Sequence, residues 1–247
     1  MRRHQLAQML IIGVIASAIG IAVALSINWF PVQASSQARK IDDLWDVLLI
    51  ASVPVFVLVE VVVLYSVWKF RMRPGDELRD GAPIHGNTAL EVVWTAIPAL
   101  VIFSLCVYAY VVLSDIERKP KHEMVVNITG QQFAWSYQYR VPGKPTVTAY
   151  QLYLPRGESV RFRIQSTDVI HDFWVPAFRV KIDAVPGITT SYRITPIRNG
   201  TYPAVCNELC GLGHATMRST VHVMDRSAFE GWLASRQAAK PAGATTS

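Results

Sequence analysis

The sequence predicts a membrane-anchored all-β protein, in which a transmembrane helical hairpin precedes a β-sandwich or β-barrel. Two observations indicate this fold class. Hydrophobic residues make up 51% of the 247-residue chain and charged residues only 17%, and the apolar excess lies in the first 115 residues. From about residue 121 the sequence changes to short alternating segments separated by turn signals, a pattern typical of β-strands.

The N-terminal segment, residues 1–35, opens with basic residues and continues with about twenty mostly apolar residues, enough to span a bilayer. Small residues in "VQASS" (32–36) offer a cleavage site. The segment is therefore either a signal peptide or an N-terminal membrane anchor, and the sequence leaves both open.

Two further apolar runs, 47–68 and 92–113, predict a transmembrane helical hairpin over residues 36–117. The connection after the first run carries a basic cluster of Lys69, Arg71 and Arg73. Because such clusters mark cytoplasmic loops, we expect this connection inside the cell and the following domain on the outer face. The sequence thus predicts a multi-pass membrane protein with its C-terminal domain on the outer face.

The predicted β-domain covers residues 118–236. Its strands are rich in valine, threonine and aromatic residues and alternate with turn signals such as "VPGKP" and "PRGE". A short helix over 226–236 ends this domain, and the small polar residues 237–247 predict a disordered tail. The predicted strands are 122–129, 133–140, 148–154, 159–166, 190–197 and 219–224.

The charge and the motifs exclude some functions. The net charge of +6 comes from dispersed basic residues without any recognisable nucleic-acid module, so we expect no nucleic-acid partner. No Cys-x-x-Cys-His motif occurs, so the chain carries no covalently attached c-type haem.

The segment "CNELCGLGHATM" concentrates metal-binding side chains, with Cys206, Cys210, His214 and Met217 on a predicted loop between two strands. A disulfide between the two cysteines is one explanation, since the domain faces an oxidising compartment. Structural zinc is another, because it favours thiolate and imidazole. A thioether beside Cys and His suits copper better than zinc.

Copper needs a further ligand from outside this loop, and His171 in "DVIHDFWVPAF" is the best candidate because bulky apolar residues follow it. A single blue copper uses one cysteine, two histidines and a weak methionine. The second cysteine and Glu208 exceed that requirement. The donor set therefore favours a binuclear site.

These segments resemble cytochrome c oxidase subunit II. "CNELCGLGHATM" is similar to the loop of that family that holds the binuclear CuA centre. "DVIHDFWVPAFRVKIDAVPG" resembles its upstream histidine segment, "GQQFAWSYQY" its aromatic segment and "LEVVWTAIPAL" the start of its second core helix. The resemblance implies a cupredoxin-like Greek-key β-barrel carrying CuA over residues 118–236.

The resemblance also implies a role for each donor. Cys206 and Cys210 would bridge the two coppers, and His171 and His214 would be terminal imidazole ligands. Met217 and the main-chain carbonyl of Glu208 would be weak outer ligands. The Glu208 carboxylate would reach a magnesium ion at the interface with subunit I. The full implied set of metal-binding residues is His171, Cys206, Glu208, Cys210, His214 and Met217.

By the same resemblance, the chain would accept electrons from cytochrome c on the outer face and pass them to haem in subunit I. Oxygen reduction to water and proton translocation would occur in that partner, and other oxidase subunits would also bind. Phe133 stands where many members have a tryptophan that receives the electron, so Phe133 and Trp135 are both candidates. Glu91 resembles a family glutamate at the mouth of a proton path; the alternative is a helix N-terminal acid.

The charge of the predicted outer domain also departs from the family pattern. Residues 121–234 hold twelve Lys and Arg against eight Asp and Glu. Complementarity favours a neutral or acidic cytochrome donor, or an apolar docking patch.

Three other functions are compatible with parts of this pattern. A quinol oxidase subunit would lack copper, against which the complete donor set argues. A free membrane-anchored copper carrier would not need two core helices or Glu91. A CuA-bearing subunit of another respiratory reductase, acting on a nitrogen oxide, is the nearest alternative.

Overall fold

The computed structural model describes residues 3–75, 83, 85–140 and 143–238. The chain divides into two compact units. The first runs to Trp29 and from Asp43 to Val112, and the second, here called the β-unit, contains Phe30–Asp42 and the chain from Leu113 onward. The predicted tail lies outside the described residues from 239 onward.

The first unit is helical. Three helices of the described residues are long and apolar enough to cross a membrane. The predicted hairpin is therefore confirmed, and a third helix precedes it. The middle helix begins at Ser36, earlier than the apolar run at 47, because the Ser35 hydroxyl accepts a hydrogen bond from the Ala38 N–H (3.1 Å) and caps the helix. The helices are α1 (Arg3–Ser26), α2 (Ser36–Phe70) and α3 (Thr88–Ile116).

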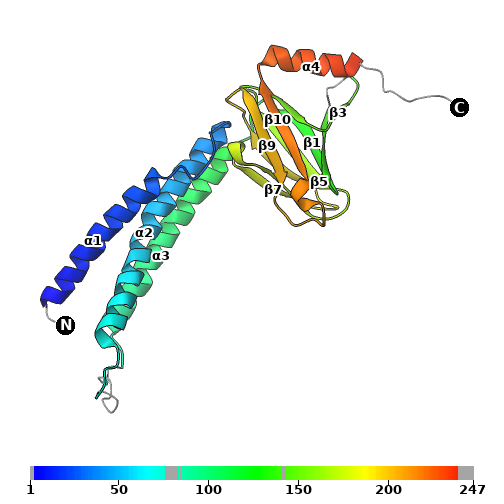
Figure 1. Ribbon diagram of the computed structural model, residues 1–247. Coiled ribbons are helices and arrows are strands. Elements are labelled where there is room, and N and C mark those ends of the chain that lie inside the picture. The colour runs from blue at the N-terminus through cyan, green and yellow to red at the C-terminus, as the bar shows by residue number, and fades with distance from the viewer. Residues whose placement is uncertain (1–2, 76–82, 84, 141–142, 239–247) are drawn as a thin grey trace. The chain divides into compact units, whose positions relative to one another are not determined.

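The β-unit is built from two five-stranded sheets, which Figure 1 shows in green to orange. One sheet has the order β3-β2-β1-β5-β8 and the other β4-β10-β9-β6-β7. Parallel pairing of β1 with β5 and of β4 with β10 requires crossover connections, as in a Greek-key barrel. The strands are β1 (Met124–Gln131), β2 (Ala134–Tyr139), β3 (Val147–Ala149), β4 (Leu152–Pro155), β5 (Val160–Ser166), β6 (His171–Val175), β7 (Val180–Ala184), β8 (Thr190–Ile194), β9 (Gly200–Cys206) and β10 (Arg218–Met224). Short 3-10 turns, η1 (Pro176–Phe178) and η2 (His214–Thr216), and a final helix, α4 (Arg226–Ala238), complete it.

Four strands differ from the prediction. The single strand expected at 148–154 is wrong: the chain leaves one sheet after β3 and joins the other at β4, with exposed Tyr150 and Gln151 between them. Strands β6 and β7 were not predicted, and β9 was expected only as the strand before the ligand loop, without bounds. In β6 nearly every side chain is buried, so "HDFWV" lacks the alternation that identifies a half-exposed strand.

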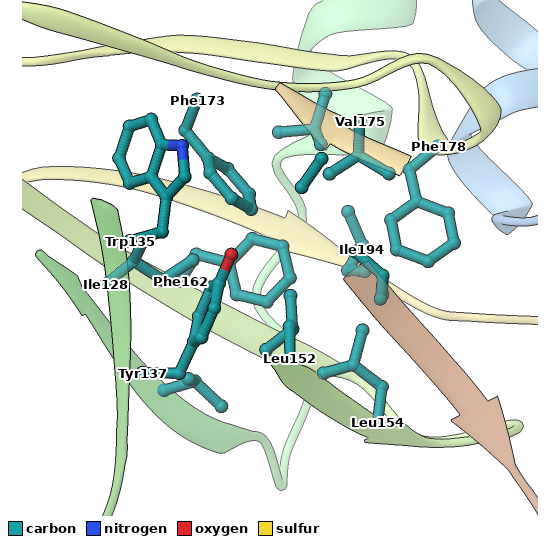
Figure 2. Packing of buried hydrophobic residues seen from close by; sticks show 14 of the residues in the cluster. Ile128, Trp135, Tyr137, Leu152, Leu154, Phe162, Phe173, Val175, Phe178 and Ile194 are labelled. Carbon is teal, nitrogen blue, oxygen red and sulfur yellow. The ribbon is translucent and has the colours of Figure 1, made fainter. Parts of the chain in front are cut away.

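Aromatic side chains fill the space between the sheets (Figure 2). Phe173 on β6 lies at their centre and makes edge-to-face contacts with Trp135 (5.2 Å between ring centroids), Tyr137 (6.2 Å) and Phe162 (5.9 Å). All four side chains are at most 1% exposed. Each such pair adds about 0.5–1.5 kcal/mol to the burial term, so β6 is held firmly where His171 begins it.

Residues preceding the hairpin also belong to the β-unit. Ala34 and Ser35 are fully buried, and Ser35 pairs with Pro196 as an isolated β-bridge. The Ala34 N–H donates to the Ala177 carbonyl (2.9 Å), and the Ala34 carbonyl accepts from the Ile197 N–H (2.9 Å). The segment that offers a cleavage site in the sequence is thus an integral part of the folded β-unit.

Candidate metal centre

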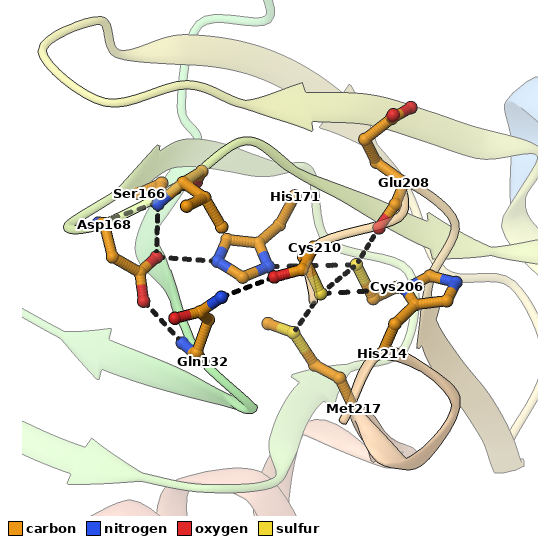
Figure 3. A network of polar contacts seen from close by, with 10 residues as sticks. Gln132, Ser166, Asp168, His171, Cys206, Glu208, Cys210, His214 and Met217 are labelled. Carbon is orange, nitrogen blue, oxygen red and sulfur yellow. Dashed lines mark hydrogen bonds and ion pairs between the residues drawn. The ribbon is translucent and has the colours of Figure 1, made fainter. Parts of the chain in front are cut away.

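The predicted ligands come together at one end of the β-unit, between β6, β9 and the loop before β10 (Figure 3). His171 is the first residue of β6 and Cys206 the last residue of β9. These strands are neighbours, with Phe173 paired to Cys206, so the two ligands lie side by side. Cys210 follows on the β9–β10 loop, which the sequence correctly predicted as a loop.

The donor atoms are close to one another. The Cys206 sulfur lies 3.8 Å from the Cys210 sulfur and 3.9 Å from His171 Nδ1. The Cys210 sulfur lies 3.6 Å from His214 Nδ1 and 3.8 Å from the Met217 thioether. Ligand atoms of His171, Cys206 and Cys210 all fall within 4.8 Å of each other, the spacing of groups that share metal ions.

The two cysteines do not form the disulfide that was one reading of the sequence. Their sulfurs are 3.8 Å apart, whereas a disulfide bond is about 2.05 Å long. Burial, followed by the neighbouring Cys206 sulfur, raises the pKa of the Cys210 thiol to about 11. The metal-free site therefore keeps this thiol protonated near neutral pH, and a metal ion that binds it must displace the proton.

A sixth donor is a main-chain oxygen. The Glu208 carbonyl lies 3.3 Å from the Cys206 sulfur, while its carboxylate is exposed and points away from the sulfurs (Figure 3). Two thiols, two imidazoles, a fully buried thioether and a carbonyl form a mainly soft donor set. This set fits copper, and the Met217 thioether is the donor that zinc would not use.

The loop that carries most donors is fixed by its own backbone. The Cys206 N–H donates to the Met217 carbonyl (3.0 Å), and the His214 N–H donates to the Gly211 carbonyl (3.1 Å). A Cβ atom at Gly213 would lie 2.5 Å from the Phe133 ring, so only glycine permits this approach. The backbone of this loop thus holds its donor residues in fixed relative positions.

Asp168 is part of the site but was not predicted. The His171 Nε2–H donates to its Oδ1 (2.8 Å), which leaves Nδ1 directed at the Cys206 sulfur. Burial raises the pKa of Asp168, but hydrogen bonds from the Gln132 N–H, His171, the Val169 N–H and the Ser166 hydroxyl outweigh it and lower the pKa to about 2. The carboxylate is therefore a permanent acceptor. Its position three residues before His171 was the signal available in the sequence.

The remaining predicted residues are the electron-entry candidates Phe133 and Trp135 and the proton-path candidate Glu91. Phe133 is partly exposed, and its ring lies against the glycines of the ligand loop. Trp135 is 1% exposed and makes an edge-to-face contact with the His171 ring at 5.9 Å. Glu91 lies in the first unit, in the first turn of α3, where its Oε1 accepts from the Asn87 N–H (3.4 Å). That contact is the one expected of a helix N-terminal acid.

Comparisons with known proteins agree with this geometry. The sequence matches the family described as "Cytochrome C oxidase subunit II, periplasmic domain" over residues 145–224 and the corresponding transmembrane domain over residues 21–112. It is 31% identical over 281 residues to cytochrome c oxidase subunit 2 of Thermostichus vulcanus, covering 92% of this chain and 84% of the relative.

A second relative and a solved structure complete the comparison. Cytochrome c oxidase subunit 2 of Alkalihalophilus pseudofirmus is 36% identical over 198 residues, covering 75% of this chain and 56% of the relative. The periplasmic domain of subunit II of cytochrome oxidase (CoxB) of Bradyrhizobium japonicum is 30% identical, with a TM-score of 0.44, covering 47% of this chain and 95% of that one. With its membrane helices, its two-sheet β-unit and its clustered sulfur and imidazole donors, the chain belongs to the cytochrome c oxidase subunit II family.

Proposed function

We propose that this chain is the electron-accepting subunit of a haem–copper cytochrome c oxidase and that it holds a binuclear CuA centre. The observation that carries the proposal is the convergence of His171, Cys206, Cys210, His214 and Met217 within contact distance. When bound, copper supplies one-electron redox chemistry at this site.

The roles of the individual donors follow from their positions. Cys206 and Cys210 face each other at the centre of the cluster, where both sulfurs can be shared by two ions. His171 lies beside one sulfur and His214 beside the other, as expected of two terminal ligands. The Met217 thioether and the Glu208 carbonyl would be the weak outer ligands. The chain's task is to hold these donors rigidly and to exclude water.

Electrons would arrive through the aromatic residues on the outer side of the site. Phe133 is the exposed candidate, and buried Trp135 makes an edge-to-face contact with the His171 ring. Exposed Leu209 and Leu212 on the ligand loop would add an apolar docking area for the cytochrome. This agrees with the excess of basic over acidic residues in the β-domain sequence, which does not favour docking by charge to a basic donor.

The remaining roles concern the partner subunits. The exposed Glu208 carboxylate is free to bind a magnesium ion at the interface with subunit I. Glu91, at the start of α3, would form the mouth of a proton path into that subunit, which holds the haem and translocates protons. The β-unit would lie on the outer face of a prokaryotic plasma membrane, and a quinol oxidase subunit would have no use for the assembled donors.

Purification of the full chain from its native membrane tests this proposal. A haem-bearing subunit should copurify, and the complex should oxidise reduced cytochrome c while consuming oxygen. A chain that purifies alone with copper would instead be a free carrier. A complex that reduces a nitrogen oxide but not oxygen would identify the alternative reductase.

A further inference from the structure

Gln132 connects the two segments that carry the predicted metal ligands. It lies in the turn between β1 and β2, outside both segments. Its side-chain Nε2–H donates to the Cys210 carbonyl (2.5 Å), and its main-chain N–H donates to Asp168 Oδ2 (2.7 Å). Figure 3 shows both contacts on opposite sides of the residue.

One contact ends on Cys210, a predicted metal ligand, and the other ends on Asp168, the hydrogen-bond partner of the predicted ligand His171. Asp168 accepts from the His171 imidazole with its other oxygen, so two hydrogen bonds through Asp168 connect the Gln132 backbone to that predicted ligand. The Cys210 carbonyl belongs to the ligand itself. A shift of Gln132 would therefore change the separation of His171 from Cys210.

The close approach of Gln132 to the ligand loop depends on a glycine. Gly211 has a φ of +132°, and a Cβ atom there would lie 2.8 Å from Gln132 Nε2. A side chain at 211 would push the amide away from the Cys210 carbonyl. Gly211 of the ligand loop thus leaves room for the Gln132 side chain, which reaches the loop from the turn between β1 and β2.

We propose that Gln132 is a positioning residue that fixes the distance between the His171 and Cys210 segments and thereby the geometry of the bound copper. This inference rests on the proposed function, since copper must occupy the site for the effect to be seen. The side chain supplies one connection and the backbone the other, so substitutions at 132 remove only the connection to Cys210.

The test compares copper-loaded full-length chain in detergent as wild type, Gln132→Glu, Gln132→Met and Gln131→Glu. Gln132→Glu replaces the donor by an acceptor of the same shape, and Gln132→Met removes it without charge. Gln131→Glu is the matched control, because this exposed neighbour makes no side-chain hydrogen bond among the described residues and receives the same added charge. The measurements are the rate of copper release to a chelator, the electron paramagnetic resonance spectrum and the melting temperature of the metal-free chain.

Both Gln132 variants should release copper about tenfold faster than wild type and show altered copper hyperfine splitting, as expected for loss of a contact just outside the ligands. The control should match wild type in both. Spectra and copper-release rates in the Gln132 variants that equal those of wild type would overturn the inference. A lower melting temperature with an unchanged spectrum would also overturn it, because it would indicate a role in folding alone. Failure of the wild type to bind two coppers would instead refute the proposed function.

Discussion

Residues 30–42, which lead into and begin α2, should stabilise the β-unit through one buried ion pair. Arg179 is 5% exposed in its side chain and forms a two-pronged contact with Asp42, with Nε 2.7 Å from Oδ1 and Nη2 2.8 Å from Oδ2. The guanidinium also donates to the Pro31 carbonyl and lies 4.7 Å from the centre of the Phe30 ring. Asp42→Ala removes the only carboxylate facing this buried cation among the described residues.

The loss of stability caused by Asp42→Ala follows from the burial of the ion pair. Removing one partner of a buried ion pair costs about 3–5 kcal/mol, and because Asp42 is 17% exposed we expect the lower end, about 3 kcal/mol. For a unit of this size each kcal/mol lowers the melting temperature by roughly 3 °C, so the loss should be about 9 °C. Near-UV circular dichroism of the metal-free full chain in detergent reports the melting of the packed aromatic residues.

The matched control is Asp43→Ala, which removes an exposed neighbouring carboxylate that has no ion pair among the described residues. It should change the melting temperature by less than about 2 °C, as most surface substitutions do. Equal effects of the two substitutions, or a loss below about 3 °C for Asp42→Ala, would show that residues 30–42 do not contribute to the folded β-unit as described.

Three further predictions concern the site and the N-terminal segment. Cys206→Ser should abolish the electron paramagnetic resonance signal of a shared copper pair, whereas Met217→Leu should keep two coppers per chain and shift the reduction potential. Burial and the facing Asp183 carboxylate raise the pKa of Asp172 to about 6, so the folded chain loses stability as the pH rises from about 4 to 6. At pH 7.5 the Asp172→Asn variant should therefore melt at a higher temperature than wild type, with a free energy of unfolding larger by at most ~3 kcal/mol. At pH 4 the variant and wild type should melt at the same temperature. The same melting temperature for variant and wild type at both pH values would contradict this. Intact mass of the membrane-purified chain should include Ala34 and the residue before it, because a new N-terminus at Ala34 or Ser35 would place a charged amine in a buried position; a chain that starts at either residue would refute this.

The sequence predicted the parts of this protein that have a local signature. The hairpin follows from uninterrupted apolar runs, and the clustering of the predicted loop ligands Cys206, Cys210, His214 and Met217 follows from their dense spacing. His171 could be selected because bulky apolar residues follow it, although β6 itself was missed, since a strand buried on both faces has no alternation.

What the sequence did not predict depends on contacts between distant segments. Gln132 and Asp168 are polar residues in turns, and only the fold brings both to the metal ligands. Likewise, nothing near Ala34 indicates that it pairs with residues beyond 170, because its hydrogen bonds run to Ala177 and Ile197. Such contacts are visible only after the chain has folded.

We propose that two copper ions share one unpaired electron at the site built on Cys206 and Cys210. The most direct test is electron paramagnetic resonance of the copper-loaded full-length chain, combined with copper and protein quantification. We expect two coppers per chain and a spectrum in which one unpaired electron couples equally to both nuclei. One copper per chain with the electron localised on a single nucleus would contradict it.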